Sequence, residues 1–454
     1  MSSLKHRIDL TNGSTRHHLI RMTLPMIWGI LAMVSFQLVD AFYISRLGTV
    51  ELAAISFTFP ITYGIFSIFI GFSIATSSVL SRLIGKGDME NVRRIASHGL
   101  ILVFITSLLI ALIGIPLLDP LFRSMGADDT TLPLIKSFMI PYFIGTFFVS
   151  MPVVGNAALR AAGDSIFPAV VMTIAALINA AINPFLIFGL AGFPRLELFG
   201  AALGTILANV CAMAAGIYIM HKRGLIDFAH IKNFAHFGDS AKRLLMIALP
   251  AGITGMLPSF HGSVVTAQLA RHGDAAVAAF GAAMRVEAFF MVILMALSIG
   301  MAPIIGQNWG AGNLERVRQT IRHALIFAFI WSALGGLTLL LLREPIAGIF
   351  SEDPHVTQTI ALYFLIVGPS YALGNIIHGW SSAFNAIGKP QIAASALLTK
   401  TILLGIPAVI IGNNMGGTQG VFIALSLINV GAGLAFHFWA HHALGSRYTP
   451  ALQA

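Results

Sequence analysis

The sequence predicts an all-α integral membrane protein with about twelve transmembrane helices in two parallel six-helix repeats, related by a pseudo-twofold axis along the membrane normal. Two observations lead to this fold class. Hydrophobic residues make up 57% of the 454 residues and charged residues only 10%, whereas soluble domains carry about 25% charged residues. The chain also repeats itself, because GKGDMENVRRIASHGL at residues 85–100 nearly recurs as GAGNLERVRQTIRHAL at residues 310–325, an offset of 225 positions.

The apolar stretches define the predicted helices. Crossing a ~30 Å hydrocarbon core requires roughly 20 mostly apolar residues. The stretches do not alternate as barrel strands do, and a helix satisfies its own backbone hydrogen bonds in lipid. The first stretch is longer than the apolar core of a signal peptide, so we expect it to be retained. The predicted spans are residues 20–44, 51–79, 93–117, 133–156, 166–190, 198–221, 243–269, 275–303, 317–342, 357–382, 391–412 and 418–442.

The net charge of +9 comes from basic residues that are spread among the short loops between spans. This distribution does not indicate binding to nucleic acid. If the N-terminus is inside, 19 Lys and Arg residues lie on inner segments and six on outer segments, which is the positive-inside distribution. We therefore predict a multi-pass protein of a bacterial-type inner membrane with both termini in the cytoplasm. We expect it to act as a monomer in the lipid bilayer.

The basic segment His221–Arg243 is the longest predicted inner loop and divides the two copies. It predicts an N-terminal lobe at residues 1–221, a cytoplasmic linker at 222–242 and a C-terminal lobe at 243–454. Each copy contains an even number of spans, so both enter the membrane in the same orientation and the repeats are parallel. Transporters built from such repeats bind substrate near the midplane and work by alternating access.

The repeated loop follows the second span of each copy. Its glycines, including Gly87 and Gly312, permit a sharp reversal of the chain. Asp88 and Asn313 then stand where a residue caps the next helix. Neither loop follows a strand or continues into Lys-Ser/Thr, so a phosphate-binding loop is not predicted.

Four polar residues within the spans of the first copy have apolar counterparts in the second. An acid at mid-bilayer costs about 2.5–3.5 kcal/mol on insertion scales, so polar and ionisable groups there are functional candidates. The matched positions are Asp40 with Val265, Asn179 with Leu404, Asn183 with Ala408, and Thr205 with Leu425.

These four residues predict a cation-coupling site. Asn179 and Asn183 are four residues apart, which places both side chains on one helix face. With Asp40 as the charge and with amide and hydroxyl oxygens around it, the cluster suits a proton or a small hard cation such as Na+. The alternative is that Asp40 is wetted at the outer end of its span while the asparagines join helices. Pro25, in the same span as Asp40, predicts a helix bend.

The second copy carries its own ionisable residues within its spans. Both positive and negative charges occur among them. They could line a substrate cavity or a gate, or they could form ion pairs with one another. Two of them, Arg285 and Glu287, are two residues apart and therefore project to different helix faces. The set is His261, Arg285, Glu287, His378 and Lys400.

Four segments resemble the multidrug and toxic compound extrusion (MATE) family. They are LVDAFYISRLGTVELAA at residues 38–54, AAFGAAMRVE at 278–287, IIGQNWGAGN at 304–313 and FNAIGKP at 384–390. The resemblance covers nearly the whole chain. It implies secondary-active efflux of varied, often cationic, organic compounds in exchange for H+ or Na+, with no cofactor and no resident metal.

Within that family the chain resembles the prokaryotic DinF-like branch. The branch pattern is an acid in span one, Asn-x-x-x-Asp-Pro in span five and a threonine in span six, which this chain matches at Asp40, Asn179, Pro184 and Thr205. It departs from the pattern at Asn183, where Asp is expected. The missing carboxylate favours H+ over Na+ as the coupling ion.

Other function classes fit less well. A flippase for a lipid-linked or amphipathic precursor is the alternative, although Arg285 and Lys400 are few basic groups for a phosphate cavity. The sequence has no paired intramembrane acids, HExxH motif or nucleophile constellation that would indicate an enzyme. It has no filter-like loop that would indicate a channel.

Overall fold

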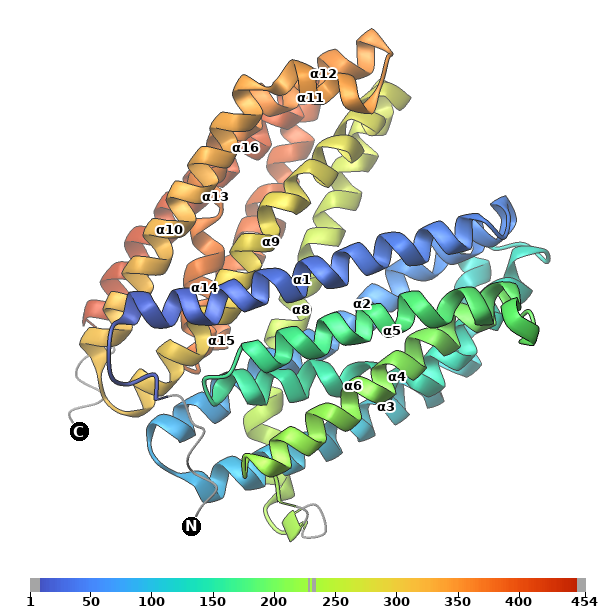
Figure 1. Ribbon diagram of the computed structural model, residues 1–454. Helices are drawn as coiled ribbons and strands as arrows, with labels where there is room; N and C mark the ends of the chain where they lie inside the picture. Colours follow the sequence, from blue (N-terminus) through green and yellow to red (C-terminus); the bar gives the residue numbers. More distant parts are fainter. Residues whose placement is uncertain (1–8, 228, 231–233, 447–454) are drawn as a thin grey trace. The chain divides into compact units, whose positions relative to one another are not determined.

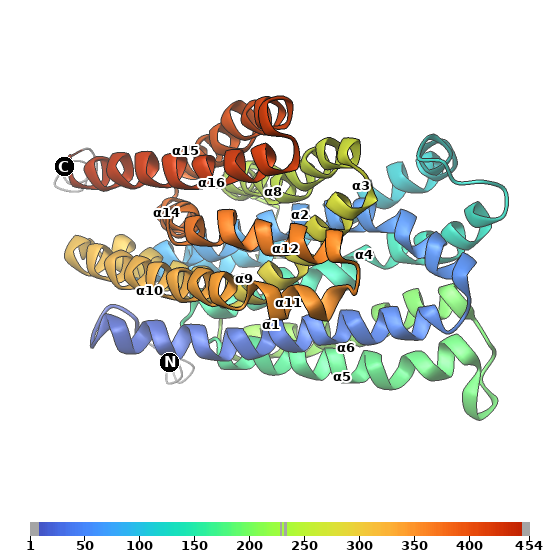
Figure 2. The ribbon, with the colours of Figure 1, turned by 90° about the horizontal axis from the view of Figure 1, so that it is seen from above.

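The computed structural model describes residues 9–227, 229–230 and 234–446, and in these residues it consists of helices joined by turns (Figures 1 and 2). The all-α prediction is therefore confirmed. The first half contains α1 (Thr15–Ser45), α2 (Thr49–Gly85), α3 (Met89–Ser124), α4 (Thr131–Ala161), α5 (Ile166–Phe188), the 3₁₀ turn η2 (Leu190–Gly192) and α6 (Glu197–Lys222).

The second half contains long helices and several interrupted ones. In order they are α8 (Phe237–Leu269), η3 (Ala270–His272), α9 (Asp274–Gly310), α10 (Leu314–Leu341), α11 (Arg343–Phe350), α12 (Pro354–Val367), η4 (Gly368–Ser370), α13 (Tyr371–Gly374), α14 (Ile376–Ala386), α15 (Pro390–Leu398), η5 (Thr399–Gly405) and α16 (Ile406–Ser446). The interruptions at η4 and η5 lie inside predicted spans.

Eleven helical segments of the described chain are long and apolar enough to cross a membrane. The last of them, Pro390–Leu444, is 55 residues long and covers both of the last two predicted spans. The helix is broken at Gly416 and Gly417, and Gly417 has a φ of +54°. Because most side chains avoid that conformation, the glycine allows the chain to change direction between the two spans.

By contact, the chain separates into two compact units. Unit 1 contains Arg21–Gly252, and unit 2 contains Thr11–Ile20 with the chain from Ile253 onward. The units divide inside α8, after the predicted linker at residues 222–242, and the start of α1 belongs to unit 2. The division into functional lobes stays a prediction.

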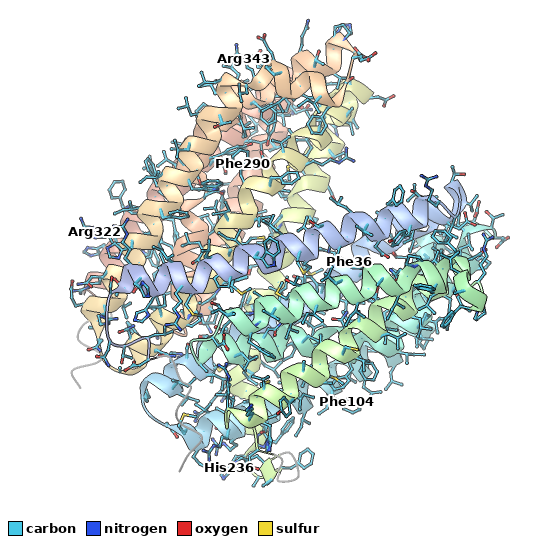
Figure 3. All side chains as sticks on the ribbon, viewed as in Figure 1. Phe36, Phe104, His236, Phe290, Arg322 and Arg343 are labelled. Atoms are coloured by element: carbon cyan, nitrogen blue, oxygen red, sulfur yellow. The ribbon has the colours of Figure 1, made fainter. Side chains whose placement is uncertain are left out.

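Unit 1 is built around α4, which packs against α2, α3 and α6, while α5 packs against α6. Its core includes Phe69, Phe72 and Phe122, all buried. Apolar side chains also cover the outside of the unit, as Phe104, 49% exposed, illustrates (Figure 3). Such a surface suits lipid contact, since lipid tails are as apolar as these side chains.

Unit 2 is built around α9, which packs against α10, α12 and α14. Phe290 of α9, labelled in Figure 3, packs with its ring near that of Trp331. It also lies close to Gly335 of α10. Val265, the counterpart of Asp40, is fully buried in the apolar core of this unit. The repeat position that carries a charge in unit 1 is therefore a packing position in unit 2.

The two copies of the repeated loop have the same backbone conformation. Gly87 and Gly312 have φ values of +77° and +78°, so the predicted role of these glycines is confirmed. Asp88 caps α3, because its side chain accepts a hydrogen bond from the backbone N–H of Asn91. The matching prediction for Asn313 is wrong, since its side chain makes no such bond at the start of α10.

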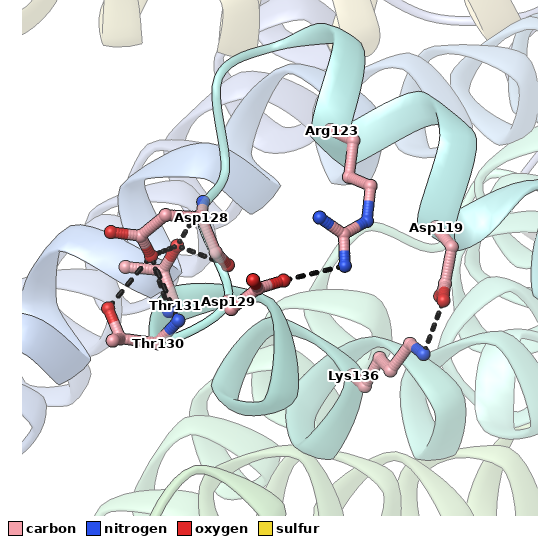
Figure 4. A network of polar contacts seen from close by, with 7 residues as sticks. All are labelled: Asp119, Arg123, Asp128, Asp129, Thr130, Thr131 and Lys136. Atoms are coloured by element: carbon pink, nitrogen blue, oxygen red, sulfur yellow. Dashed lines mark hydrogen bonds and ion pairs between the residues drawn. The ribbon is translucent and has the colours of Figure 1, made fainter.

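The turn between α3 and α4 is held by a network of polar contacts (Figure 4). Oδ1 of Asp128 accepts hydrogen bonds from the backbone N–H and the hydroxyl of both Thr130 and Thr131. The bond from the Thr131 backbone N–H makes the largest contribution to lowering the pKa of Asp128, from 3.8 to about 2. Asp128 therefore acts as the cap at the start of α4.

Replacing Asp128 with alanine is expected to lower the melting temperature of the purified protein by a few degrees, because the first turn of α4 loses its cap. The lowered pKa means that this contribution is fully present above the ordinary pKa of 3.8 and disappears as the pH falls through about 2. The control is Asp129→Ala, which removes only an exposed ion pair with Arg123. Equal melting temperatures for Asp128→Ala and the wild type at pH 7 would contradict the assignment.

Candidate functional site

Unit 1 brings together the four polar residues that the repeat comparison singled out. Nδ2 of Asn183, on α5, donates a hydrogen bond of 2.7 Å to Oδ1 of Asp40, on α1. Asn183 is fully buried and Asp40 half-buried. Oδ1 of Asp40 is thus bonded to an amide N–H. Oδ2 is the oxygen of this carboxyl group that could accept a proton.

The other two residues form a second pair beside the first. Nδ2 of Asn179 donates to Oγ1 of Thr205, on α6, at 3.1 Å, and that hydroxyl donates to the carbonyl oxygen of Ala201, also at 3.1 Å. Since Asn179 lies one helical turn from Asn183, α5 links both pairs. The site therefore draws on α1, α5 and α6.

Two buried amide oxygens in this cluster accept no hydrogen bond. They are Oδ1 of Asn179 and Oδ1 of Asn183. Buried polar groups in proteins are nearly always paired, so these two oxygens are exceptions among the described residues. Oδ1 of Asn183 faces Gly204 of α6 so closely that a Cβ there would overlap it. That oxygen is therefore partly shielded from any ligand.

Two glycines of α6 set the distance between α5 and α6. A Cβ on Gly200 would lie 2.5 Å from the carbonyl oxygen of Leu186, and one on Gly204 would overlap Asn183. Gly200 and Gly204 form a Gly-x-x-x-Gly pattern, which lets helices approach closely in membranes. This pattern is visible in the sequence and was the available signal for Gly204 as a site residue.

Tyr43 also belongs to the site, and the sequence comparison missed it. Its hydroxyl donates to the carbonyl oxygen of Ala180, on α5, at 3.2 Å. Since Tyr43 follows Asp40 by three residues on α1, the bond holds the Asp40 face of α1 against α5. No local pattern marks this contact, because it depends on how the two helices are rotated.

Pro25 lies inside α1, which runs as one helix from Thr15 to Ser45. Its backbone nitrogen has no hydrogen to donate to the turn before it. The predicted bend at Pro25 stays a prediction.

The predicted set in unit 2 is only partly brought together. Oε1 of Glu287, on α9, accepts hydrogen bonds from the hydroxyls of Tyr363, at 2.5 Å, and of Tyr371. Lys400, on η5, donates through Nζ to the carbonyl oxygen of Gly374 at 3.2 Å. Neither tyrosine was predicted.

The remaining predicted residues of unit 2 occupy different surroundings. His261 and His378 are half-buried, and both interact electrostatically with Lys400. Arg285 is exposed, although it is only two residues from Glu287. Arg285 therefore differs from the other four residues in being exposed.

The family model MatE matches the chain twice, at residues 25–185 and 250–411, and the two matches begin 225 residues apart, like the internal repeat. A FAD transporter of Shewanella oneidensis is 35% identical over 438 residues, which are 96% of this chain and 97% of that relative. Multidrug export protein MepA of Staphylococcus haemolyticus is 27% identical, over 90% of this chain and 89% of that relative. The crystal structure of the Vibrio cholerae MATE transporter VcmN in the bent form has a TM-score of 0.89 and 29% identity, with 98% of this chain and 99% of that chain covered.

Proposed function

Because this chain belongs to the MatE family of membrane transporters, we propose that it is an antiporter that exports organic compounds in exchange for H+. The observation that carries the proposal is the Asp40 cluster of unit 1, where the carboxyl group of Asp40 is hydrogen-bonded to the buried amide of Asn183. An antiporter must bind its coupling ion from one side of the membrane and release it to the other, and a carboxyl group within the membrane can do this for a proton. The matching position in unit 2 is the core residue Val265.

H+ is the proposed coupling ion rather than Na+. Asp40 is the only carboxylate in the cluster of Asp40, Asn179, Asn183 and Thr205, and a hard cation is usually held by several oxygen ligands. Oδ1 of Asn183 faces Gly204 instead of Asp40. A single carboxylate with one hydrogen-bond donor is sufficient for a proton and a poor cage for Na+. The same feature, Asn183 in place of Asp, sets the chain apart within the DinF-like branch to which we assign it.

Protonation of Asp40 is proposed to change the bend of α1 at Pro25. VcmN is described in a bent form, and in this chain Pro25 lies four turns before Asp40 in the same helix. Neutral Asp40 would hold Asn183 less strongly than the carboxylate does, which loosens α1 from α5. The bend itself requires the missing N–H of proline.

We propose FAD as the first substrate to test, since the relative from Shewanella oneidensis is named a FAD transporter. Cationic drugs are the second class, since MepA is named a multidrug export protein. The two classes differ in driving force. Exchange of one H+ for one monovalent cation moves no net charge, so only the pH gradient drives it, at about 1.4 kcal/mol per pH unit. Export of an anion also draws on the membrane potential, at about 2.3 kcal/mol per charge per 100 mV.

The test is efflux of FAD or ethidium from loaded proteoliposomes, with a pH gradient, a Na+ gradient and a valinomycin-clamped K+ potential imposed separately. We expect an acidic exterior to drive export of both compounds, and an inside-negative potential to accelerate only FAD. Protein-free liposomes give the leak rate. Export driven by neither ion gradient would contradict antiport, and export driven by Na+ alone would contradict H+ coupling.

The protein is proposed to work as a monomer in a bacterial inner membrane with both termini in the cytoplasm. The basis is the distribution of Lys and Arg among its loops. Its substrates reach it as small organic solutes, with the bilayer as its only other required partner.

A further inference from the structure

Two interrupted helices of unit 2 lie next to each other at Lys400. The first runs from α12 through η4 and α13 to α14, with breaks at Gly368–Ser370 and Asn375. The second contains the π-helix η5, Thr399–Gly405. Irregular backbone within a membrane span is tolerated where it is buried in protein or lines a cavity, and both π-turns and discontinuous helices are frequent at binding sites.

The break in the first helix frees a carbonyl group for Lys400. In a regular helix the backbone N–H of His378 would donate to Gly374, four residues earlier. It donates instead to Asn375, three residues earlier, at 3.1 Å. The carbonyl oxygen of Gly374 accepts from Nζ of Lys400. This is the single hydrogen bond that the described residues give an ammonium group with three N–H donors.

The acidic residue nearest in character to a partner for Lys400, Glu287, is hydrogen-bonded to two tyrosines instead. Tyr363 and Tyr371 both donate a hydrogen bond to Oε1 of Glu287, so the two hydroxyls hold this carboxyl group in place. Lys400 and Glu287 are bonded to other groups, and no ion pair within 4.0 Å joins them in the described residues. Tyr371 and Gly374 are at the two ends of α13, so this one-turn helix contacts Glu287 through one end and Lys400 through the other.

Two histidines complete the region around Lys400. His261 Nε2 lies beside η5, where a Cβ on Gly405 would be 3.1 Å from it, and His378 is at the start of α14. A lysine that forms no ion pair in the described residues, with two imidazole rings nearby that can donate hydrogen bonds, can receive an anion. An internal ion pair would instead place Glu287 and Lys400 in contact.

We propose that Lys400, His261 and His378 form a subsite for a phosphate group of the exported solute, with Glu287 as the resident counter-ion that promotes its release. The proposal rests on the proposed export of FAD, because it names the part of the transporter that recognises the diphosphate. It makes Lys400 the residue that decides between anionic and cationic substrates.

The test compares FAD with riboflavin, which has the same ring system and no phosphate, in binding to the purified wild type and to Lys400→Gln. The Kd for FAD is expected to rise about tenfold or more in Lys400→Gln, while the Kd for riboflavin changes less than about twofold. Glu287→Gln is expected to tighten FAD binding several-fold, because it removes the competing anion. The matched control is Lys136→Gln, which breaks a half-buried ion pair with Asp119 in unit 1.

A second measurement does not depend on flavins. Inorganic pyrophosphate is expected to raise the melting temperature of the wild type and of Lys136→Gln, but not of Lys400→Gln. No stabilisation of the wild type, or equal stabilisation of Lys400→Gln, would overturn the subsite. Equal losses of FAD and riboflavin binding in Lys400→Gln would show a structural role and also overturn it.

The outcomes separate this proposal from the proposed function. Efflux of FAD that is unaffected by Lys400→Gln keeps the antiporter and overturns the subsite. Lys400-dependent stabilisation by pyrophosphate without FAD efflux keeps the subsite and removes FAD as substrate. A lipid headgroup is the other possible source of phosphate, and micelles that contain phosphatidylglycerol test it. If this lipid raises the melting temperature of the wild type but not of Lys400→Gln, and pyrophosphate raises neither, the site binds a lipid headgroup and the solute subsite is overturned.

Discussion

Asp40→Asn is expected to reduce export driven by a pH gradient to the leak rate of protein-free liposomes. The substitution keeps the shape of the side chain, and the new amide oxygen can still accept the hydrogen bond from Asn183 that Oδ1 accepts now. It removes the only carboxylate of the cluster, so no proton can be bound and released there. Proton release when substrate is added to the purified protein in weak buffer should disappear as well.

A matched control separates coupling from general damage. Asp119→Asn makes the same chemical change in unit 1, but in a half-buried, solvent-accessible ion pair with Lys136. Such pairs contribute about 0–1 kcal/mol, so export and melting temperature should remain near the wild-type values. Wild-type export by Asp40→Asn, with proton release intact, would refute the assignment of Asp40 and the proposed bend at Pro25 together.

Gly204→Ala should also abolish coupling, although the residue carries no functional group. The added Cβ would overlap Oδ1 of Asn183, and Asn183 is fully buried. Its amide must rotate or α5 must move, and either change breaks the bond to Asp40. Overpacking of this kind costs about 1–3 kcal/mol, so we expect a folded protein with a lower melting temperature and export close to the leak rate.

Two further variants test that explanation. Gly216→Ala adds the same methyl group to α6 at a place with nothing within 4 Å, and should leave export unchanged. The double variant Gly204→Ala with Asn183→Ala removes the overlap, so its melting temperature should recover while its export stays low. If Gly204→Ala exports normally, the close approach of α6 to Asn183 has no part in coupling.

The repeat made the candidate residues of unit 1 predictable, but not their pairing. Asp40, Asn179, Asn183 and Thr205 were found because their counterparts are apolar, and that comparison needs only the sequence. Which amide meets the carboxylate depends on how α5 is rotated against α1 and α6. Asp40 and Asn183, for example, are 143 residues apart in the sequence. Tyr43 could not be found in this way, because its contact is to a backbone carbonyl.

Unit 2 was less predictable for a different reason. Hydrophobic periodicity reports a continuous span for residues 357–382, whereas the structure interrupts it at η4 and again before α14. The interruptions are stabilised by tertiary contacts, such as Lys400 on the carbonyl of Gly374, which local composition does not encode. For the same reason Tyr363 and Tyr371 gave no sequence signal as partners of Glu287.

The sequence by itself determined the membrane class, the duplication, the positions of the spans and the asymmetry of polar residues between the copies. Each of these follows from composition or from comparison of the chain with itself, because the bilayer requires apolar helices and duplication leaves a fixed offset. Only the tertiary structure decided that Asn183 pairs with Asp40, that Gly204 limits the space for it, and that two tyrosines donate hydrogen bonds to Glu287. Those contacts depend on helix rotation and close packing, which join residues far apart in the chain.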